Sequence, residues 1–159
     1  MAIKSGTVFI NKKNLSKKRK VEKELDSLVK TVKYQLHEAK GVFPFDFFPD
    51  SVIVDLNKVT IINRFLLSKN AYPVLIEDIK TVNDFHGILF SSLTFEVSGF
   101  ETNPAPVKWL WQKDAQKVRR YILAIKEARK RNIDLEALKH SEIKEKLEEI
   151  GKVLSEKEI

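Results

Sequence analysis

The chain of 159 residues contains no cysteine, and this absence excludes disulfide bonds and thiolate metal sites. Long apolar runs are missing as well. Near the N-terminus such a run reaches only three residues, at 8–10, which is too short for a signal peptide. No stretch approaches the roughly 20 apolar residues that span a membrane. The sequence therefore predicts a cytoplasmic protein.

Residue patterns that carry catalysis are also absent. The three histidines, His37, His86 and His140, have no metal-ligand spacing. The five glycines form no nucleotide-binding loop, and no serine lies in a G-x-S-x-G motif. We interpret the adjacent acids 77–78 as part of a turn or cap and the serine pair 91–92 as structural. We therefore expect no enzyme activity, no metal and no cofactor.

The composition of the chain is typical of a globular protein, and its charged residues are distributed unevenly along the sequence. Hydrophobic residues make up 43% and charged residues 32%, and the net charge is +7. Residues 1–40 carry eleven Lys/Arg and four Asp/Glu, and residues 113–159 carry 13 and ten. Residues 41–112 carry five and eight, so attraction for anions lies in the two flanking segments.

Residues 16–40 have helical periodicity. Ser16 is a suitable N-cap, and Gly41 suits the position after the last turn. One face is apolar, and the opposite face is basic, as on many helices where such a face is simply solvated. Four cations on the basic face are candidates for contact with an anionic membrane surface: Arg19, Lys23, Lys30 and Lys33.

Residues 50–111 change to strand periodicity. Short turns separate the expected strands, and no helix lies between them, which favours antiparallel pairing in a barrel or sandwich. Two helical segments, 112–131 and 135–154, follow. The six expected strands are 51–55, 59–64, 71–76, 78–85, 88–97 and 107–111.

This order resembles the bacterial pleckstrin-homology-like (PH-like) domains. Their opening hairpin resembles the segment D-S-V-I-V-D-L-N-K-V-T-I-I-N-R of this chain. The start of their capping helix resembles the segment K-D-A-Q-K-V-R-R-Y-I-L-A-I. The stretch from Phe43 to Asn132 also looks like an uncharacterised bacterial group with an F-P-F-D-x-F-P-D lead-in. The resemblance implies an α+β fold, an antiparallel open barrel of six to seven strands closed by a helix. A seventh strand would come from 100–103 or 7–10.

The expected organisation has three parts. Residues 1–42 form an N-terminal basic amphipathic helix, residues 43–132 form the PH-like barrel with its capping helix, and residues 133–159 form a short C-terminal helical extension. The family implies binding of lipid headgroups, peptides or proteins. The loop between the first two expected strands carries one lysine, Lys58, and this departs from the basic loop of phosphoinositide-binding members.

Four phenylalanines and two prolines crowd into the segment F-P-F-D-F-F-P at 43–49. The prolines favour an extended chain with Phe43, Phe45 and Phe47 on one side. Packing of this segment between the helix and the barrel is favoured over docking. The candidate partner-binding residues are Phe45, Phe47 and Phe48, with Phe48 the main docking residue.

The sequence therefore predicts a non-enzymatic binding module that contacts a protein partner. Peripheral association with anionic lipid through the basic helix is the alternative. Nucleic-acid binding is less favoured, because Lys17–Lys20 precedes an acidic stretch and no nucleic-acid module is evident. A homodimer would give the apolar stripe of residues 16–40 a place to be buried.

Overall fold

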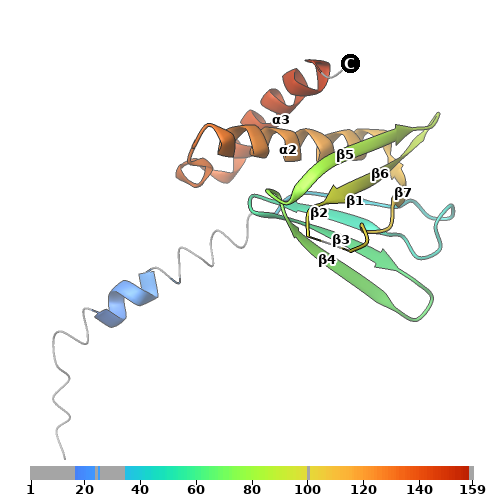
Figure 1. The fold of residues 1–159 in the computed structure, drawn as a ribbon, viewed down its shortest axis with the longest axis horizontal. Coiled ribbons are helices and arrows are strands. Elements are labelled where there is room, and N and C mark those ends of the chain that lie inside the picture. The colour runs from blue at the N-terminus through green and yellow to red at the C-terminus, as the bar shows by residue number, and fades with distance from the viewer. Residues whose placement is uncertain (1–16, 24, 26–34, 100, 158–159) are drawn as a thin grey trace, which may run out of the picture. The chain divides into compact units, whose positions relative to one another are not determined.

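A computed structural model describes residues 17–23, 25, 35–99 and 101–157. The chain divides into two compact units, residues 1–33 and residues 34–159. The second unit is an α+β fold of two antiparallel sheets and C-terminal helices (Figure 1). Among the described residues, no helix has the length and apolar character needed to span a membrane.

In the first unit, the described residues 17–23 and 25 are helical. Lys18 and Glu22 form an exposed ion pair at 3.8 Å, one helical turn apart. Arg19 and Lys23 are exposed on this helix, while Lys30 and Lys33 lie outside the described residues.

The first sheet has the strand order β1-β2-β3-β4. Its strands are β1 (Gln35–Lys40), β2 (Ser51–Asp55), β3 (Lys58–Arg64) and β4 (Lys69–Leu75). The second sheet has the order β5-β6-β7, with β5 (Ile79–His86), β6 (Phe90–Val97) and β7 (Val107–Trp111). The six strands expected from the sequence are confirmed, with ends shifted by a few residues. The sheets meet where Gly41, just after β1, pairs with Leu110 of β7.

The seventh strand is β1, and the predicted helix over 16–40 is therefore wrong at Gln35–Lys40. The register of β1 against β2 shifts between Gln35 and His37, which makes Leu36 a bulge residue. The bulge lets Leu36 and Ala39 both be buried at a spacing of three, which mimics helical periodicity. Residues 101–103 form no strand, and the alternative at 7–10 lies outside the described residues.

The two predicted C-terminal helices are confirmed, although the second begins at His140 and not at Leu135. They are α2 (Gln112–Lys130) and α3 (His140–Lys157), with the short 3₁₀ helix η1 (Leu135–Ala137) between them. Helix α2 buries one apolar face against both sheets. Helix α3 packs on α2 and adds Ile143 and Leu147 to the same core.

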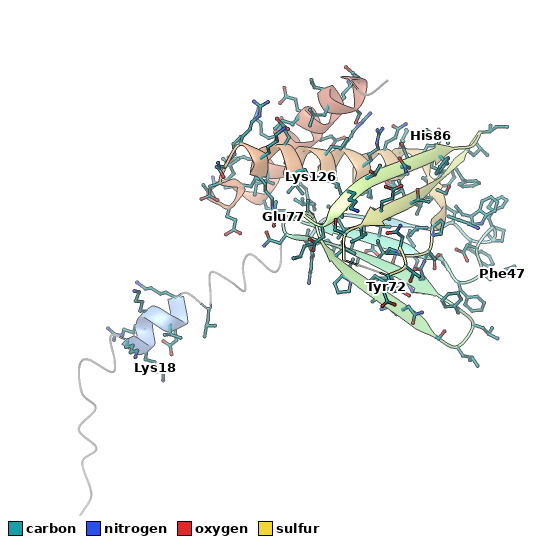
Figure 2. The ribbon with its side chains drawn as sticks, viewed as in Figure 1. Lys18, Phe47, Tyr72, Glu77, His86 and Lys126 are labelled. Atoms are coloured by element: carbon teal, nitrogen blue, oxygen red, sulfur yellow. The ribbon has the colours of Figure 1, made fainter. Side chains whose placement is uncertain are left out.

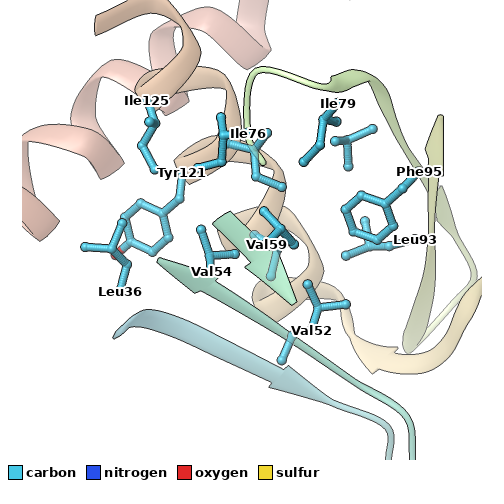
Figure 3. Packing of buried hydrophobic residues seen from close by; sticks show 14 of the residues in the cluster. Leu36, Val52, Val54, Val59, Ile76, Ile79, Leu93, Phe95, Tyr121 and Ile125 are labelled. Carbon is cyan, nitrogen blue, oxygen red and sulfur yellow. The ribbon is translucent and has the colours of Figure 1, made fainter. Parts of the chain in front are cut away.

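A single hydrophobic cluster joins the sheets and the helices (Figure 3). Val54 from the first sheet, Ile76 from the turn after β4, Phe95 from the second sheet and Ile125 from α2 are fully buried. Burying side chains of this size contributes about 1.5–3 kcal/mol each, so this cluster is the main source of stability of residues 34–159.

His37 on β1 is partly buried against α2. Its Nε2 lies 3.3 Å from Asp114 Oδ1, and its ring centroid lies 6.1 Å from that of Tyr121. Burial lowers the pKa of His37 below its ordinary 6.5, Lys117 and Lys144 act in the same direction, and Asp114 opposes them. The fold therefore favours the neutral ring.

We expect the free energy of unfolding to decrease as the pH falls below about 6.5, because the unfolded chain binds the His37 proton first. The decrease ends once the pH is below the folded-state pKa. His37→Gln should reduce this slope, which is at most about 1.4 kcal/mol per pH unit for one group, in urea titrations at pH values above and below 6.5. His140, whose pKa burial also lowers, adds a second contribution. Equal slopes in the wild type and the variant would contradict this assignment.

Candidate docking surface

The connection between β1 and β2 is a compact turn. Asp46 Oδ1 accepts a hydrogen bond from the Phe48 amide at 3.0 Å, and the Asp46 amide donates to the Val42 carbonyl at 3.1 Å. The predicted extended chain is therefore wrong, because the aspartate side chain supplies a local turn that replaces strand hydrogen bonds.

The four phenylalanines of this turn face outward. Phe43 is 67% exposed, Phe45 54%, Phe47 73% and Phe48 39%. None of the four belongs to the core of residues 34–159, so the predicted packing against the barrel is wrong. The other half of that prediction, packing against the N-terminal helix, lies outside the described residues. Phe48, the main docking residue in the sequence prediction, is the most covered of the four. Figure 2 shows Phe47 projecting from the end of the sheets, and its ring meets that of Phe43 edge-to-face at 5.8 Å.

A bulge in β7 aims a tryptophan at the same surface. The register between β6 and β7 shifts between Ser91 and Leu93, so that two residues, Lys108 and Trp109, oppose Ser92. Trp109 has φ = 58°, in the left-handed region that bulky residues rarely adopt. The Trp109 carbonyl accepts a hydrogen bond from the Val42 amide at 2.9 Å, which ties the bulge to the chain just after β1.

The exposed rings contact one another across the chain. Phe45 stacks on Trp109 with a centroid distance of 5.6 Å and an angle of 24°. Phe90 lies 5.0 Å from both Phe45 and Trp111. Such pairs contribute about 0.5–1.5 kcal/mol each, so the rings hold a defined arrangement at the surface without entering the core.

Two tight hairpins add aliphatic tips. Phe65 and Ser68 exchange backbone hydrogen bonds around the tip Leu66–Leu67, and Gly87 donates to the Phe90 carbonyl around the tip Ile88–Leu89. Exposure reaches 95% in the first tip and 96% in the second. Two-residue hairpin turns favour Asn, Asp and Gly, so these aliphatic pairs do not serve the turns themselves.

These loops lie at one end of the sheets (Figure 1), and hydrogen bonds tie them to neighbouring elements. Asp50, at the end of the β1–β2 turn, accepts from the Arg64 amide at 2.7 Å and from Asn63 Nδ2 at 3.1 Å. Gln112 Nε2, at the start of α2, donates to the Ile88 carbonyl at 3.4 Å. We call this surface the apolar end and define it by its exposed large side chains: Phe43, Phe45, Phe47, Phe48, Phe65, Leu66, Leu67, Phe85, Ile88, Leu89, Trp109 and Trp111.

A shallow cavity of about 310 Å³ opens within the apolar end. Three aromatic side chains, Phe85, Phe90 and Trp109, contribute to its lining, together with the polar residues Ser92 and Lys108. Its volume lies at the lower limit of small-molecule sites, which are about 300–1,000 Å³. The cavity offers apolar contact and one cation.

The charge around the apolar end is positive. The segments 40–50, 64–69, 85–90 and 107–113 hold five Lys/Arg and two aspartates. Both aspartates accept hydrogen bonds from the chain itself, as described above for the β1–β2 turn. The exposed lysines are therefore the charges that a partner would meet first.

A polar network lies behind the β5–β6 tip. His86 Nδ1 lies 2.9 Å from Ser91 Oγ, its Nε2 lies 2.9 Å from Asp84 Oδ2, and Arg119 of α2 lies 3.5 Å from the same carboxylate. Ser91 is only 3% exposed, which agrees with the structural role predicted for this serine. The network joins β5, β6 and α2, and therefore supports the hairpin that carries Ile88–Leu89.

Sequence reasoning found the phenylalanines of the β1–β2 turn but missed the rest of the surface. The predicted strands 59–64 and 71–76 left residues 65–70 between them, and the apolar start of that segment, Phe65-Leu66-Leu67, was the available signal. The basic residues Arg19 and Lys23 belong to the separate N-terminal unit, and the placement of their unit relative to the apolar end is not described.

Comparison of the chain with protein-family models, with curated proteins and with solved structures finds no match.

Proposed function

We propose that this protein is a non-enzymatic docking module of PH-like fold and that the apolar end is its binding surface. The observation that carries the proposal is the exposure of twelve large hydrophobic side chains on the loops at one end of the sheets, on β7 and at the end of β5. A contiguous apolar surface of this kind is typical of sites that associate with a protein or a membrane.

The stability of the fold does not explain why these hydrophobic side chains are exposed. Polar residues at the tips Leu66–Leu67 and Ile88–Leu89 would suit the hairpins better. The left-handed backbone of Trp109 costs about 1–3 kcal/mol and serves to direct its ring outward. Departures from local rules that the fold does not need concentrate at functional sites.

A partner strand added to the free edge of β4 is a less favourable mode of binding. The hydrogen-bonded pairs Phe65–Ser68 and Asn57–Ile76 set the alternation along β3 and β4. This alternation turns the backbone nitrogen of Pro73 toward the free edge, and proline has no amide hydrogen to donate. Pro73 therefore interrupts the edge, and the apolar end is the better binding surface.

The variant Leu66→Ser/Leu67→Ser tests the docking function. In gentle lysates of the native cell we expect the wild-type chain to migrate in fractions larger than its 18.4 kDa monomer and the variant to migrate as the monomer. Because both leucines are exposed, the free energy of unfolding should change by less than about 0.5 kcal/mol.

Leu75→Ser is the matched control. Leu75 is 54% exposed and lies at the opposite end of β4 from Leu66–Leu67, so its substitution should leave the migration unchanged. A wild-type chain that migrates as a monomer, or a tip variant that migrates like the wild type, would refute docking through the apolar end.

A further inference from the structure

We propose that the partner of the apolar end is a lipid bilayer and that the two aliphatic tips insert at the level where headgroups meet acyl chains. This inference rests on the docking function proposed above and names its partner class. It differs from association through the basic N-terminal helix, because it assigns the contact to the β-sheet unit.

The composition of the tips favours lipid over a protein surface. Protein interfaces concentrate their affinity in Trp, Tyr and Arg placed in packed pockets, and leucine is under-represented there. Here the most exposed side chains are aliphatic, and Leu67 and Ile88 are 95% and 96% exposed at the ends of separate hairpins. Protruding aliphatic groups fit a fluid acyl region, which adapts to their shape, better than a rigid partner.

The order of side chains along the strands also matches a membrane interface. Trp111 pairs with Phe90, immediately behind the Ile88–Leu89 tip, and Trp109 lies two residues further back on β7. Tryptophan prefers the headgroup level, where its ring is half apolar and half polar, while aliphatic groups prefer the acyl region. The two tryptophans are 43% and 49% exposed, so both are available to lipid.

Charge at the apolar end agrees with this orientation. Lys69 follows the first tip and Lys108 precedes Trp109, and both are exposed. The carboxylates of Asp46 and Asp50 accept hydrogen bonds from the chain itself. Docking on a membrane therefore does not leave these carboxylates without hydrogen-bond donors. Lysines behind an inserted apolar surface add attraction for anionic headgroups.

The fluorescence of the chain's own tryptophans can report contact of the apolar end with lipid. Its only two tryptophans, Trp109 and Trp111, both lie on the apolar end. The probes are phosphatidylcholine vesicles with and without phosphatidylglycerol. With the full-length wild-type chain we expect co-sedimentation and a shift of tryptophan emission to shorter wavelength with both compositions, because insertion removes the indoles from water. High salt should weaken only the added affinity for phosphatidylglycerol.

Two tip variants, Leu66→Ser/Leu67→Ser and Ile88→Ser/Leu89→Ser, should each lower the vesicle partition coefficient by at least about tenfold, because each loses two buried aliphatic groups. Leu75→Ser should bind like the wild type. Arg19→Glu/Lys23→Glu should lose affinity only for phosphatidylglycerol vesicles at low salt. Circular dichroism and thermal unfolding establish that every variant is folded.

The outcomes separate this inference from the docking proposal. If vesicles leave the tryptophan emission of the wild type unchanged while its migration in native lysates still depends on the tips, the bilayer inference is refuted and docking on a protein stands. If the lysate migration also does not depend on the tips, both proposals fail.

A purified chain that forms a dimer with buried tryptophans in the absence of lipid would refute the bilayer inference and would show that a second copy of the chain covers the apolar end. Binding to phosphatidylglycerol that Arg19→Glu/Lys23→Glu abolishes, with no emission shift, assigns lipid contact to the helix and also refutes the inference.

Discussion

Gly151→Ala is expected to lower the free energy of unfolding by about 1–3 kcal/mol, although alanine is the better helix former. Gly151 is buried where α3 crosses α2. An added Cβ would overlap the Arg120 carbonyl oxygen and lie only 2.7 Å from its carbonyl carbon. The obstacle is helix backbone, which cannot rotate away like a flexible side chain, so α3 must move off α2.

The measurement is the denaturant midpoint and the thermal midpoint, which for a chain of this size should fall by about 2–4 °C per kcal/mol. Lys152→Ala is the control, because Lys152 is exposed on the same helix and its loss should change stability by less than about 0.5 kcal/mol. A Gly151→Ala variant that is more stable than the wild type would show that helix propensity outweighs the backbone contact, and that the two helices are not closely packed there.

Arg129→Met is expected to cost about 1.5–3 kcal/mol. The Arg129 guanidinium donates to the Leu56 carbonyl at 2.8 Å and also bonds to Asn57, both in the β2–β3 turn, and it pairs with Glu77 at 2.7 Å. Glu77 is mostly exposed, so that ion pair contributes little. Most of the lost stability comes from the Leu56 carbonyl, which loses its hydrogen-bond donor. Methionine keeps the apolar stem of the arginine but none of its hydrogen bonds.

Arg131→Met is the matched control for this prediction. Arg131 pairs with Glu127 one turn earlier on the exposed side of α2, and such pairs contribute about 0.3–0.5 kcal/mol. Urea unfolding of the two variants side by side measures the difference. Equal losses for Arg129→Met and Arg131→Met would mean that the contacts of Arg129 with the β2–β3 turn do not stabilise the fold.

Part of the candidate site could be predicted from the sequence and part could not. The crowding of phenylalanines at 43–49 is visible in the sequence, but their exposure is not. Alternation on an extended chain assigned Phe43, Phe45 and Phe47 to packing and left Phe48 for docking, whereas all four are exposed on the Asp46 turn. The role of Trp109 depends on a bulge and a left-handed φ, and these arise only when β7 pairs with β6.

Local periodicity by itself determined most of the secondary structure. The alternation of residues 50–111 and the helical stripes after residue 111 predict both C-terminal helices and six of the seven strands found in the described part of the chain, because each element buries one face with its own period. The absence of cysteine, also read from the sequence alone, excludes disulfide bonds within this chain.

Tertiary structure alone decided the state of Gln35–Lys40 and the position of the apolar end. The bulge at Leu36 gives a strand the spacing of a helix, and only pairing with β2 distinguishes the two. Likewise, the β1–β2 turn, the two hairpin tips and β7 are separated by tens of residues in the chain. They form one surface because antiparallel strands return their turns to the same end of the sheets, a consequence of pairing that no local pattern contains.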